Sequence, residues 1–141
     1  MFKVFQIELS DEKADEVNAA GCWSKVAWGK AYLDLTMGMF SDSDNVSVME
    51  MILEAIEFGL VKHTMTIDCE ELETAYALGN GMGDQSVVTH HGRHKSASVG
   101  DIFLRADSRG GGVVLNFGFE LLSEEEVKEI ETLVPQKMML A

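Results

Sequence analysis

Three histidines, His90, His91 and His94, lie within a span of five residues. Imidazole is the commonest metal ligand in proteins, so these side chains are candidate ligands for an ion such as zinc. Adjacent histidines seldom reach one tetrahedral centre together, and no cysteine or carboxylate nearby has the spacing of a further ligand. Asp84 or His63 would join such a site only if the fold brought them there. A metal site is therefore one prediction for this segment, and a solvated loop without a metal is the other.

The same part of the chain is basic, although the protein as a whole is acidic. Between residues 88 and 119, four basic side chains accompany two aspartates. Arg93, Arg105 and Arg109 are therefore candidates to bind a phosphate group or an acidic patch on a partner. The alternative is that this basic surface pairs with acidic side chains of the protein itself.

The sequence contains no motif that assembles a catalytic site. The triple glycine at 110–112 lacks the Gly-Lys-Ser/Thr ending and the strand-to-helix context of a phosphate-binding loop. Ser96, Ser98 and Asp101 are not framed by a nucleophile turn such as Gly-x-Ser-x-Gly. We therefore expect a protein without enzymatic activity.

Length and composition are typical of one folded domain, which we place at residues 1–141. With 141 residues, 46% of them hydrophobic, the chain can bury one core without a metal or disulfide staple. It has 24 acidic against 11 basic side chains, a formal net charge of -13. Such a charge repels nucleic-acid phosphates and anionic membranes and attracts basic proteins. We expect a basic protein partner and no nucleic acid or membrane; solubility alone is the alternative explanation of the charge.

Two cysteines, Cys22 and Cys69, lie far apart in the sequence and form no Cys-x-x-Cys motif. We expect free, buried thiols in a reducing compartment rather than a disulfide framework. The N-terminal segment carries Lys3, Gln6 and Glu8 within its apolar run, which is not typical of a signal peptide. No stretch of the sequence is long and apolar enough to span a bilayer. A cytoplasmic protein is the resulting expectation.

Apolar periodicity predicts a strand and three helices in the first part of the chain. Residues 2–9 alternate polar and apolar side chains, as a half-buried strand does. Ser10 is predicted to be the N-cap of a helix that begins at Asp11, and Gly21 is predicted to end this helix. Further helices are expected at 24–37 and from about 45 to 58.

A second strand and a fourth helix are expected next. Residues 61–67 alternate apolar and polar side chains and predict a strand. Asp68 is predicted to cap the next helix, and residues 79–81 are predicted to end it. Residues 81–97 lack periodicity and predict an irregular segment.

The last part of the chain predicts a hairpin, a further strand and a helix. Two apolar runs flank residues 107–112, where the glycines would take positive φ in a turn. An adjoining strand is expected at 117–122, and Ser123 and Glu126 have capping-box spacing for a helix that ends before Pro135. The whole order predicts an α+β fold, a small and mostly antiparallel sheet with helices packed on one face.

A sequence pattern runs through this second half. A helix ending in Asn80 is followed by Ser-Ala-Ser-Val-Gly-Asp at 96–101 and by Gly118 and Phe119 in a later strand. This order resembles a pattern in small phage and mobile-element accessory proteins, among them YodL-like proteins. The resemblance covers residues 68–122 and implies a Ser-x-Ser-Val-Gly-Asp entry into a hairpin closed by a Gly-Phe strand. It implies a phage-encoded protein and no enzymatic activity, because no catalytic residue belongs to the pattern.

These features predict a small acidic protein that is not catalytic and that binds or regulates a protein partner. An alternative is a metal- or phosphate-binding protein that uses the His/Arg segment at 90–105. A further alternative is a self-associating structural subunit. It rests on the methionines of the predicted helices, because methionine adapts to irregular surfaces: Met37, Met39, Met49 and Met51.

Overall fold

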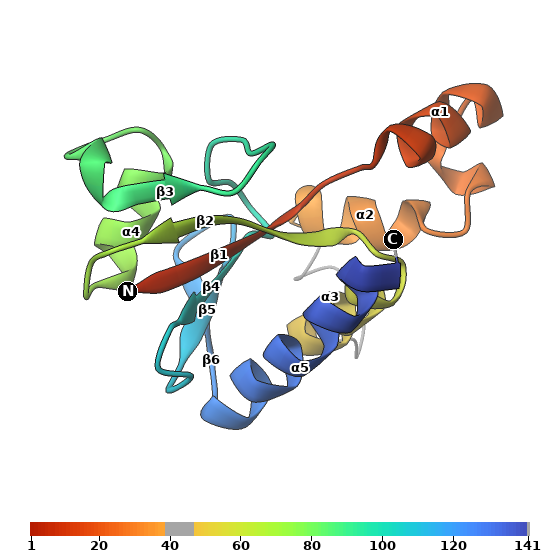
Figure 1. The fold of residues 1–141 in the computed structure, drawn as a ribbon. Helices are drawn as coiled ribbons and strands as arrows, with labels where there is room; N and C mark the ends of the chain where they lie inside the picture. The colour runs from red at the N-terminus through yellow and green to blue at the C-terminus, as the bar shows by residue number, and fades with distance from the viewer. Residues whose placement is uncertain (39–46, 141) are drawn as a thin grey trace.

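The computed structural model describes residues 1–38 and 47–140, with the backbone alone at 135–140. Its described part contains one six-stranded antiparallel sheet flanked by helices, with strand order β3-β2-β1-β4-β5-β6 (Figure 1). The strands are β1 (Phe2–Ile7), β2 (Val61–Ile67), β3 (Val88–His90), β4 (Ile102–Arg105), β5 (Gly111–Val114) and β6 (Phe119–Leu122). The helices are α1 (Asp11–Ala20), α2 (Gly29–Thr36), α3 (Val48–Glu57), α4 (Leu72–Gly79) and α5 (Glu124–Leu140), with short 3-10 turns η1 (Trp23–Lys25) and η3 (Gln85–Val87).

Both faces of the sheet are covered by helices. Ile102 and Leu104 of β4 pack in one core cluster with α2, α3 and α5, whereas Phe103 packs in a second cluster with α4. Figure 1 shows α3 and α5 on one side of the sheet and α4 on the other. The predicted α+β class with an antiparallel sheet is confirmed. Helices α2, α3 and α5 cover one face of the sheet. Helix α4 adds a layer on the opposite face, because the strands are apolar on both sides.

A β-bulge in β2 changes which face that strand presents. The register of β1 against β2 shifts between Val4 and Phe5, which leaves Thr64 of β2 as the extra residue. Val61, before the bulge, therefore packs in the cluster of α3, and Met65, after it, packs in the cluster of α4. The uninterrupted alternation predicted for this strand is wrong, because one inserted residue moves all later side chains to the other face.

The caps of α1 and α5 follow the sequence predictions. The Ser10 hydroxyl accepts the N–H of Lys13 at 3.1 Å, and Gly21 ends α1 with a φ of 87°. Ser123 and Glu126 form a reciprocal capping box. The backbone N–H of each donates to the side chain of the other, at 2.9 and 3.1 Å.

The predicted start of α4 is wrong. The helix begins at Leu72, with the extended residue Glu71 as its N-cap, and not directly after Asp68. The N–H of Asp68 donates to the carbonyl of Val87 at 3.0 Å. The chain therefore remains tied to the segment before β3 at this point, and it turns into a helix only afterwards.

Two other helix limits differ from the sequence predictions. Ser47 is the N-cap of α3, and the predicted start near residue 45 lies outside the described residues. α5 does not end before Pro135 but continues through it to Leu140. Proline within a helix removes one backbone hydrogen bond and weakens the helix without always ending it.

Residues 81–97, predicted to be irregular, contain η3 and the edge strand β3. β3 pairs with β2 through three residues, among them His90 opposite Met65. Three residues are too few for an alternating pattern to show in the sequence.

Both cysteines are free, as expected, but Cys22 is exposed and Cys69 is only half-buried. The prediction of buried thiols is therefore wrong for Cys22, which lies just after the glycine that ends α1. No helix in the described part of the chain is long and apolar enough to cross a membrane.

Candidate functional site

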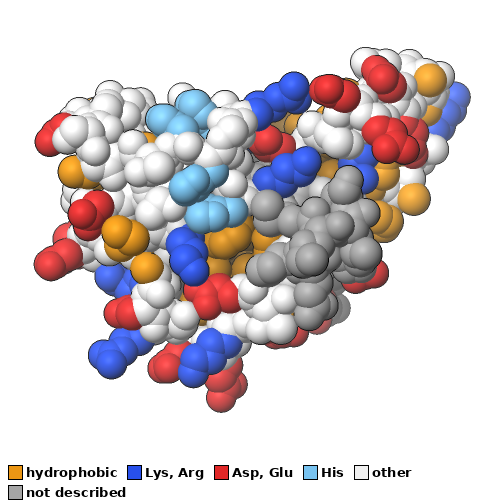
Figure 2. All heavy atoms as spheres, in the orientation of Figure 1, with side chains coloured by type: hydrophobic (Ala, Val, Ile, Leu, Met, Phe, Trp, Pro, Cys, Tyr) orange, Lys and Arg blue, Asp and Glu red, His pale blue; other side chains and the backbone are white. Residues whose placement is uncertain are grey.

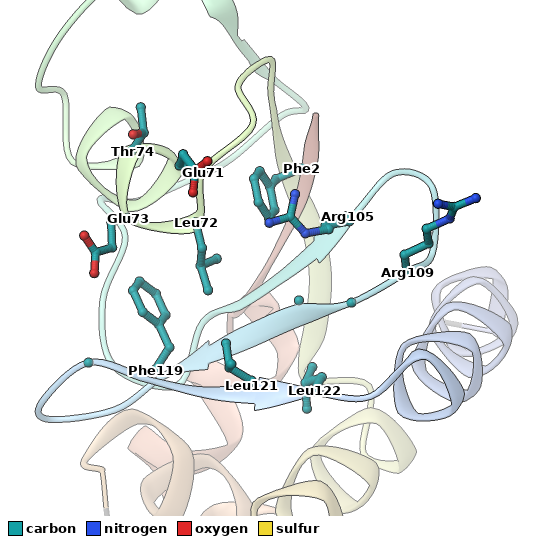
Figure 3. A pocket seen from close by; sticks show the side chains of 13 residues that line it. Phe2, Glu71, Leu72, Glu73, Thr74, Arg105, Arg109, Phe119, Leu121 and Leu122 are labelled. Atoms are coloured by element: carbon teal, nitrogen blue, oxygen red, sulfur yellow. The ribbon is translucent and has the colours of Figure 1, made fainter.

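An open groove of about 750 Å³ lies between the first turn of α4 and strands β5 and β6 (Figure 3). Leu72 of α4 lines one side, and Phe119 and Leu121 of β6 line the other. Within the described residues, β6 is the last strand on this side of the sheet. The groove therefore opens beside a sheet edge that no further strand covers.

Leu121 is the exposed apolar side chain of β6. Its side chain is 74% exposed, and that of Phe117 in the turn before β6 is 94% exposed. Leu121 lies opposite Gly112 of β5, so it has no side chain across the strand pair to pack against. Of these two, Leu121 lines the groove, and an exposed apolar side chain beside a hollow is a candidate for contact with a ligand or partner.

Two glycines of β5 permit close approach of neighbouring elements beside the groove. A Cβ on Gly111 would lie 2.2 Å from the carbonyl oxygen of Phe103, and one on Gly112 would lie 2.7 Å from Cδ2 of Leu72. Within the hairpin turn, Ser108 has the positive φ, 64°. The prediction that the triple glycine supplies positive φ is therefore wrong; two of its members lie in the strand and are needed for space.

Arg105 is held in place at the groove. Its guanidinium lies over the ring of Phe2, with Cζ 4.9 Å from the ring centroid. It also donates a hydrogen bond to the backbone carbonyl of Glu70 at 2.9 Å. Arg109, in the turn between β4 and β5, is exposed. Two of the three predicted ligand-binding arginines thus line one groove, Arg105 held by contacts and Arg109 exposed.

The groove has ends of opposite charge. Figure 3 shows Arg105 and Arg109 toward the Leu122 end of β6, Glu73 at the end near Phe119, and Glu71 between them at the start of α4. A ligand that lies along β6 therefore meets basic side chains at one end and an acidic side chain at the other.

Arg93, predicted together with these two arginines, lies elsewhere. Its guanidinium is 3.4 Å from a carboxylate oxygen of Asp11 at the start of α1. This pair lines a smaller hollow of about 370 Å³, which His63 and His91 also line. The three arginines therefore do not form one site, and Arg93 follows the alternative that it pairs with an acid of the protein itself.

The four histidines form two ring pairs on one face of the molecule (Figure 2). His90 and His94 stack with ring centroids 3.7 Å apart, and His91 lies 4.6 Å from His63. The Thr66 hydroxyl contacts Nε2 of His91 at 2.7 Å and Nε2 of His63 at 3.3 Å. Within the described part of the chain, no three His, Cys, Asp or Glu side chains are grouped as metal ligands. The fold brings His63 to His91 but divides the three predicted ligands between two pairs.

Burial lowers the pKa of His63, and the neighbouring His91 lowers it further. Burial also lowers the pKa of His90, with smaller contributions in the same direction from His94 and His91. Near neutral pH both rings therefore favour the neutral form, in which each ring pair is free of charge repulsion.

A buried polar network that was not predicted from the sequence ties the loop before β4 to β1. Gln6, Thr64 and Asp101 are all buried. The Gln6 amide donates to a carboxylate oxygen of Asp101 at 2.9 Å and to the carbonyl of Lys95 at 2.9 Å. The Thr64 hydroxyl donates to the Gln6 amide oxygen at 2.8 Å, and the N–H of Ser98 donates to the same Asp101 oxygen at 2.9 Å. The bulge at Thr64 is what places its hydroxyl in this network.

Burial raises the pKa of Asp101 to about 6, although the hydrogen bonds from Gln6 and Ser98 lower it. The second carboxylate oxygen has no hydrogen-bond partner among the described residues. Asp101 is fully buried and does not line the groove. The network therefore supports the fold and is out of reach of a ligand in the groove.

Three of the four methionines predicted to form a self-association surface are described by the structure, and these three do not share one surface. Met51 is buried in the core, and Met49 is partly buried against it. Met37 is exposed, and Met39 lies outside the described residues. The prediction is therefore wrong for Met51, which α3 directs into the core.

No protein-family model, no curated protein and no solved structure matches this chain. The resemblance of residues 68–122 to YodL-like proteins stays a prediction. The groove beside β6 and its charges are the features from which a function can be inferred.

Proposed function

We propose that the chain is a non-catalytic binding or regulatory protein that holds a segment of a partner protein in the groove between α4 and β6. The observation that supports this most is Leu121, which is 74% exposed and lies opposite Gly112 on the sheet. Covering such a leucine contributes on the order of 1–2 kcal/mol to binding. A partner that fills the groove gains this free energy on binding, because Leu121 is exposed in the protein alone.

The charge of the protein favours a basic partner. The chain has a net charge of -13, and the first turn of α5, which follows β6 directly, carries Glu124, Glu125 and Glu126. An acidic surface attracts a basic protein over a distance and speeds its encounter. Long-range electrostatic attraction by this acidic surface therefore favours basic proteins before any close contact with the groove forms.

The lining of the groove favours binding over chemistry. Among the described residues that line it are apolar side chains, Arg105 and Arg109, the glutamates Glu71 and Glu73, and Thr74, but no histidine or cysteine. Arg105 is occupied by Phe2 and by the carbonyl of Glu70. This set can orient an apolar segment that carries charges, which is the task of a recognition surface.

The proposal is tested with a photo-crosslinking amino acid at position 74, on the α4 side of the groove. In lysate, we expect light to join the protein to one discrete partner. A second substitution, Leu121→Asp, should remove this product, because it places a charge where the partner's apolar side chain would pack.

The matched control is Met82→Asp, which changes another exposed apolar side chain, 64% exposed, outside the groove. It should leave the product unchanged, and circular dichroism should confirm that both variants fold. Labelling that is equally strong in the Leu121→Asp and Met82→Asp proteins would show that the groove is not the binding site.

A further inference from the structure

Resting on the proposed function, we infer that the partner segment binds as an added β-strand, antiparallel to the outer edge of β6. The segment carries an acidic residue first, apolar residues at alternate positions in its middle, and a basic residue last. Main-chain hydrogen bonds to β6 hold it, and the two charged ends of the groove fix its direction.

The hydrogen-bond alternation of the β5–β6 hairpin leaves main-chain groups of β6 without a partner among the described residues. The N–H of Leu115 donates to the carbonyl of Gly118 at 2.9 Å, so this pair is bonded across the turn. Bonded and non-bonded pairs alternate in an antiparallel ladder, which makes Glu120 the next residue of β6 bonded to β5. Phe119 and Leu121 therefore point their N–H and C=O groups away from β5, toward the open edge.

The same two residues carry the side chains that face the groove. Phe119 belongs to the core cluster under α4, and Leu121 lies on that face opposite Gly112. A strand paired with β6 places its own side chains on this face at the positions opposite Phe119 and Leu121. Two apolar residues separated by one position would thus cover Leu121 and fill the groove.

Charge complementarity sets the direction of the segment. An antiparallel strand begins at the Leu122 end of β6, where Arg105 and Arg109 lie, and ends toward Phe119 and Glu73 (Figure 3). Its acidic residue therefore comes first and its basic residue last. All strand pairs in the described sheet are antiparallel, and this arrangement is the more stable per residue.

A second copy of this chain fits the edge less well than such a segment. Pairing β6 with itself would bring together two molecules of net charge -13. An antiparallel pairing centred on β6 would also bring the two copies of Glu120 close to one another. Like charges that meet across a strand pair are destabilising.

The test uses two labelled peptides of the same composition, acetyl-Glu-Thr-Val-Thr-Val-Thr-Lys-amide and its reverse, titrated by fluorescence anisotropy. We expect the peptide that begins with glutamate to bind about tenfold more tightly, a difference equivalent to one good charge-assisted contact. Arg109→Glu, an exposed change, should remove or reverse this preference. Tighter binding of the reversed peptide to the unaltered protein would overturn the antiparallel orientation.

N-methylation of the peptide tests the main-chain pairing. A methyl on the first valine nitrogen blocks the bond to Leu121 and should weaken binding at least about tenfold. A methyl on the next threonine nitrogen, which points away from β6, is the matched control and should leave affinity within about twofold. Binding that depends on Leu121 but tolerates both methyl groups would retain the groove and overturn strand addition.

The two proposals fail in distinguishable ways. If neither peptide binds at millimolar concentration, or if Leu121→Asp leaves peptide binding unchanged, the inferred strand is overturned. The crosslinking result at position 74 decides the groove independently of any peptide. A concentration-dependent dimer that Leu121→Asp abolishes would overturn the inferred partner segment in favour of a second copy.

Discussion

The two edges of the sheet differ in side-chain chemistry, although in the described part of the chain each is a strand with one neighbouring strand. At the β3 edge the strand is three residues long, and the polar side chains Thr89 and His90 are exposed. At the β6 edge Leu121 is exposed beside an open groove. Short strands with polar or charged side chains discourage pairing with other chains. The β3 edge follows this rule throughout, whereas the β6 edge follows it at Glu120 and departs from it at Leu121.

The β6 edge is also the better supported of the two. Leu122 and Val113 anchor β6 and β5 in the core, and the capping box of Ser123 and Glu126 fixes the chain just after the strand. β3 is held by three residue pairs with β2 and by contacts between histidine rings. The well-supported apolar edge is therefore preorganised for binding, whereas the short polar edge disfavours pairing with another strand.

The largest expected effect is a loss of stability caused by a substitution in β5, the strand that pairs with β6. In Gly111→Ala the new Cβ would lie 2.2 Å from the carbonyl oxygen of Phe103 and 3.0 Å from Cα of Leu104. Backbone atoms of β4 must then move, so we expect a loss of about 3 kcal/mol in the free energy of unfolding, measured with urea.

Gly110→Ala is the matched control for this substitution. Its Cβ would meet only the carbonyl oxygen of Leu122, at 3.7 Å, which is an ordinary contact. We expect a change within about 0.5 kcal/mol. Equal unfolding midpoints for the two variants would show that the close approach of β4 and β5 does not support this edge.

A smaller effect concerns Asp101, which lies between the two edges. Its pKa is about 6 in the folded protein and 3.8 without burial, so the stability it contributes is present at low pH and is lost as the pH rises through 6. Between pH 7 and pH 5 this group should raise the free energy of unfolding by about 1 kcal/mol. Asp101→Asn should remove that part of the pH dependence in urea titrations. An unchanged pH dependence in the variant would mean that Asp101 does not titrate in this range.

Acid should have the opposite effect at the β3 edge. The pKa values of His63 and His90 are lowered, so protonation as the pH falls below 6.5 is easier in the unfolded chain and weakens the folded edge. We expect amide hydrogen exchange in β3 to accelerate roughly twofold to fivefold from pH 7 to pH 5, after correction for intrinsic rates, and exchange in β6 not to accelerate.

His91→Gln is the control for this effect, because it removes one ring of the His63 pair and retains a group that can bond to the Thr66 hydroxyl. The acid sensitivity of β3 should become smaller in this variant. An acid response that is equal in β3 and β6 would remove the contrast between the two edges.

The smallest expected effect concerns zinc. Because His90, His91 and His94 are divided between two ring pairs, we expect zinc to change the melting temperature by no more than the experimental error. A stoichiometric stabilisation that His94→Ala abolishes would contradict this and would restore the metal site predicted from the sequence.

Local features of the fold are predictable from the sequence because neighbouring residues create them. Ser10, Gly21 and the pair of Ser123 and Glu126 act within one helical turn, so their spacing identifies helix ends. The hairpin of β4 and β5 is similarly visible from two apolar runs around a turn. The bulge at Thr64 is not visible, because one extra residue leaves the apolar composition of the strand unchanged.

The candidate site depends on contacts between distant residues, and only part of it could be predicted from the sequence. Arg105 and Arg109 were predicted, but their separation from Arg93 follows from the strand order. The exposure of Leu121 depends on which residue lies opposite, and that residue is Gly112. Register of this kind is fixed by tertiary packing and not by the local pattern of apolar residues.

The position of β1 in the sheet has a consequence for how the molecule folds. β1 precedes both strands with which it pairs, since β2 begins at Val61 and β4 at Ile102. The centre of the sheet is therefore completed only after two long loops have closed, and closing such loops before contacts form slows folding. During synthesis, β1 leaves the ribosome with both of its edges unpaired and remains so until β2 and then β4 follow.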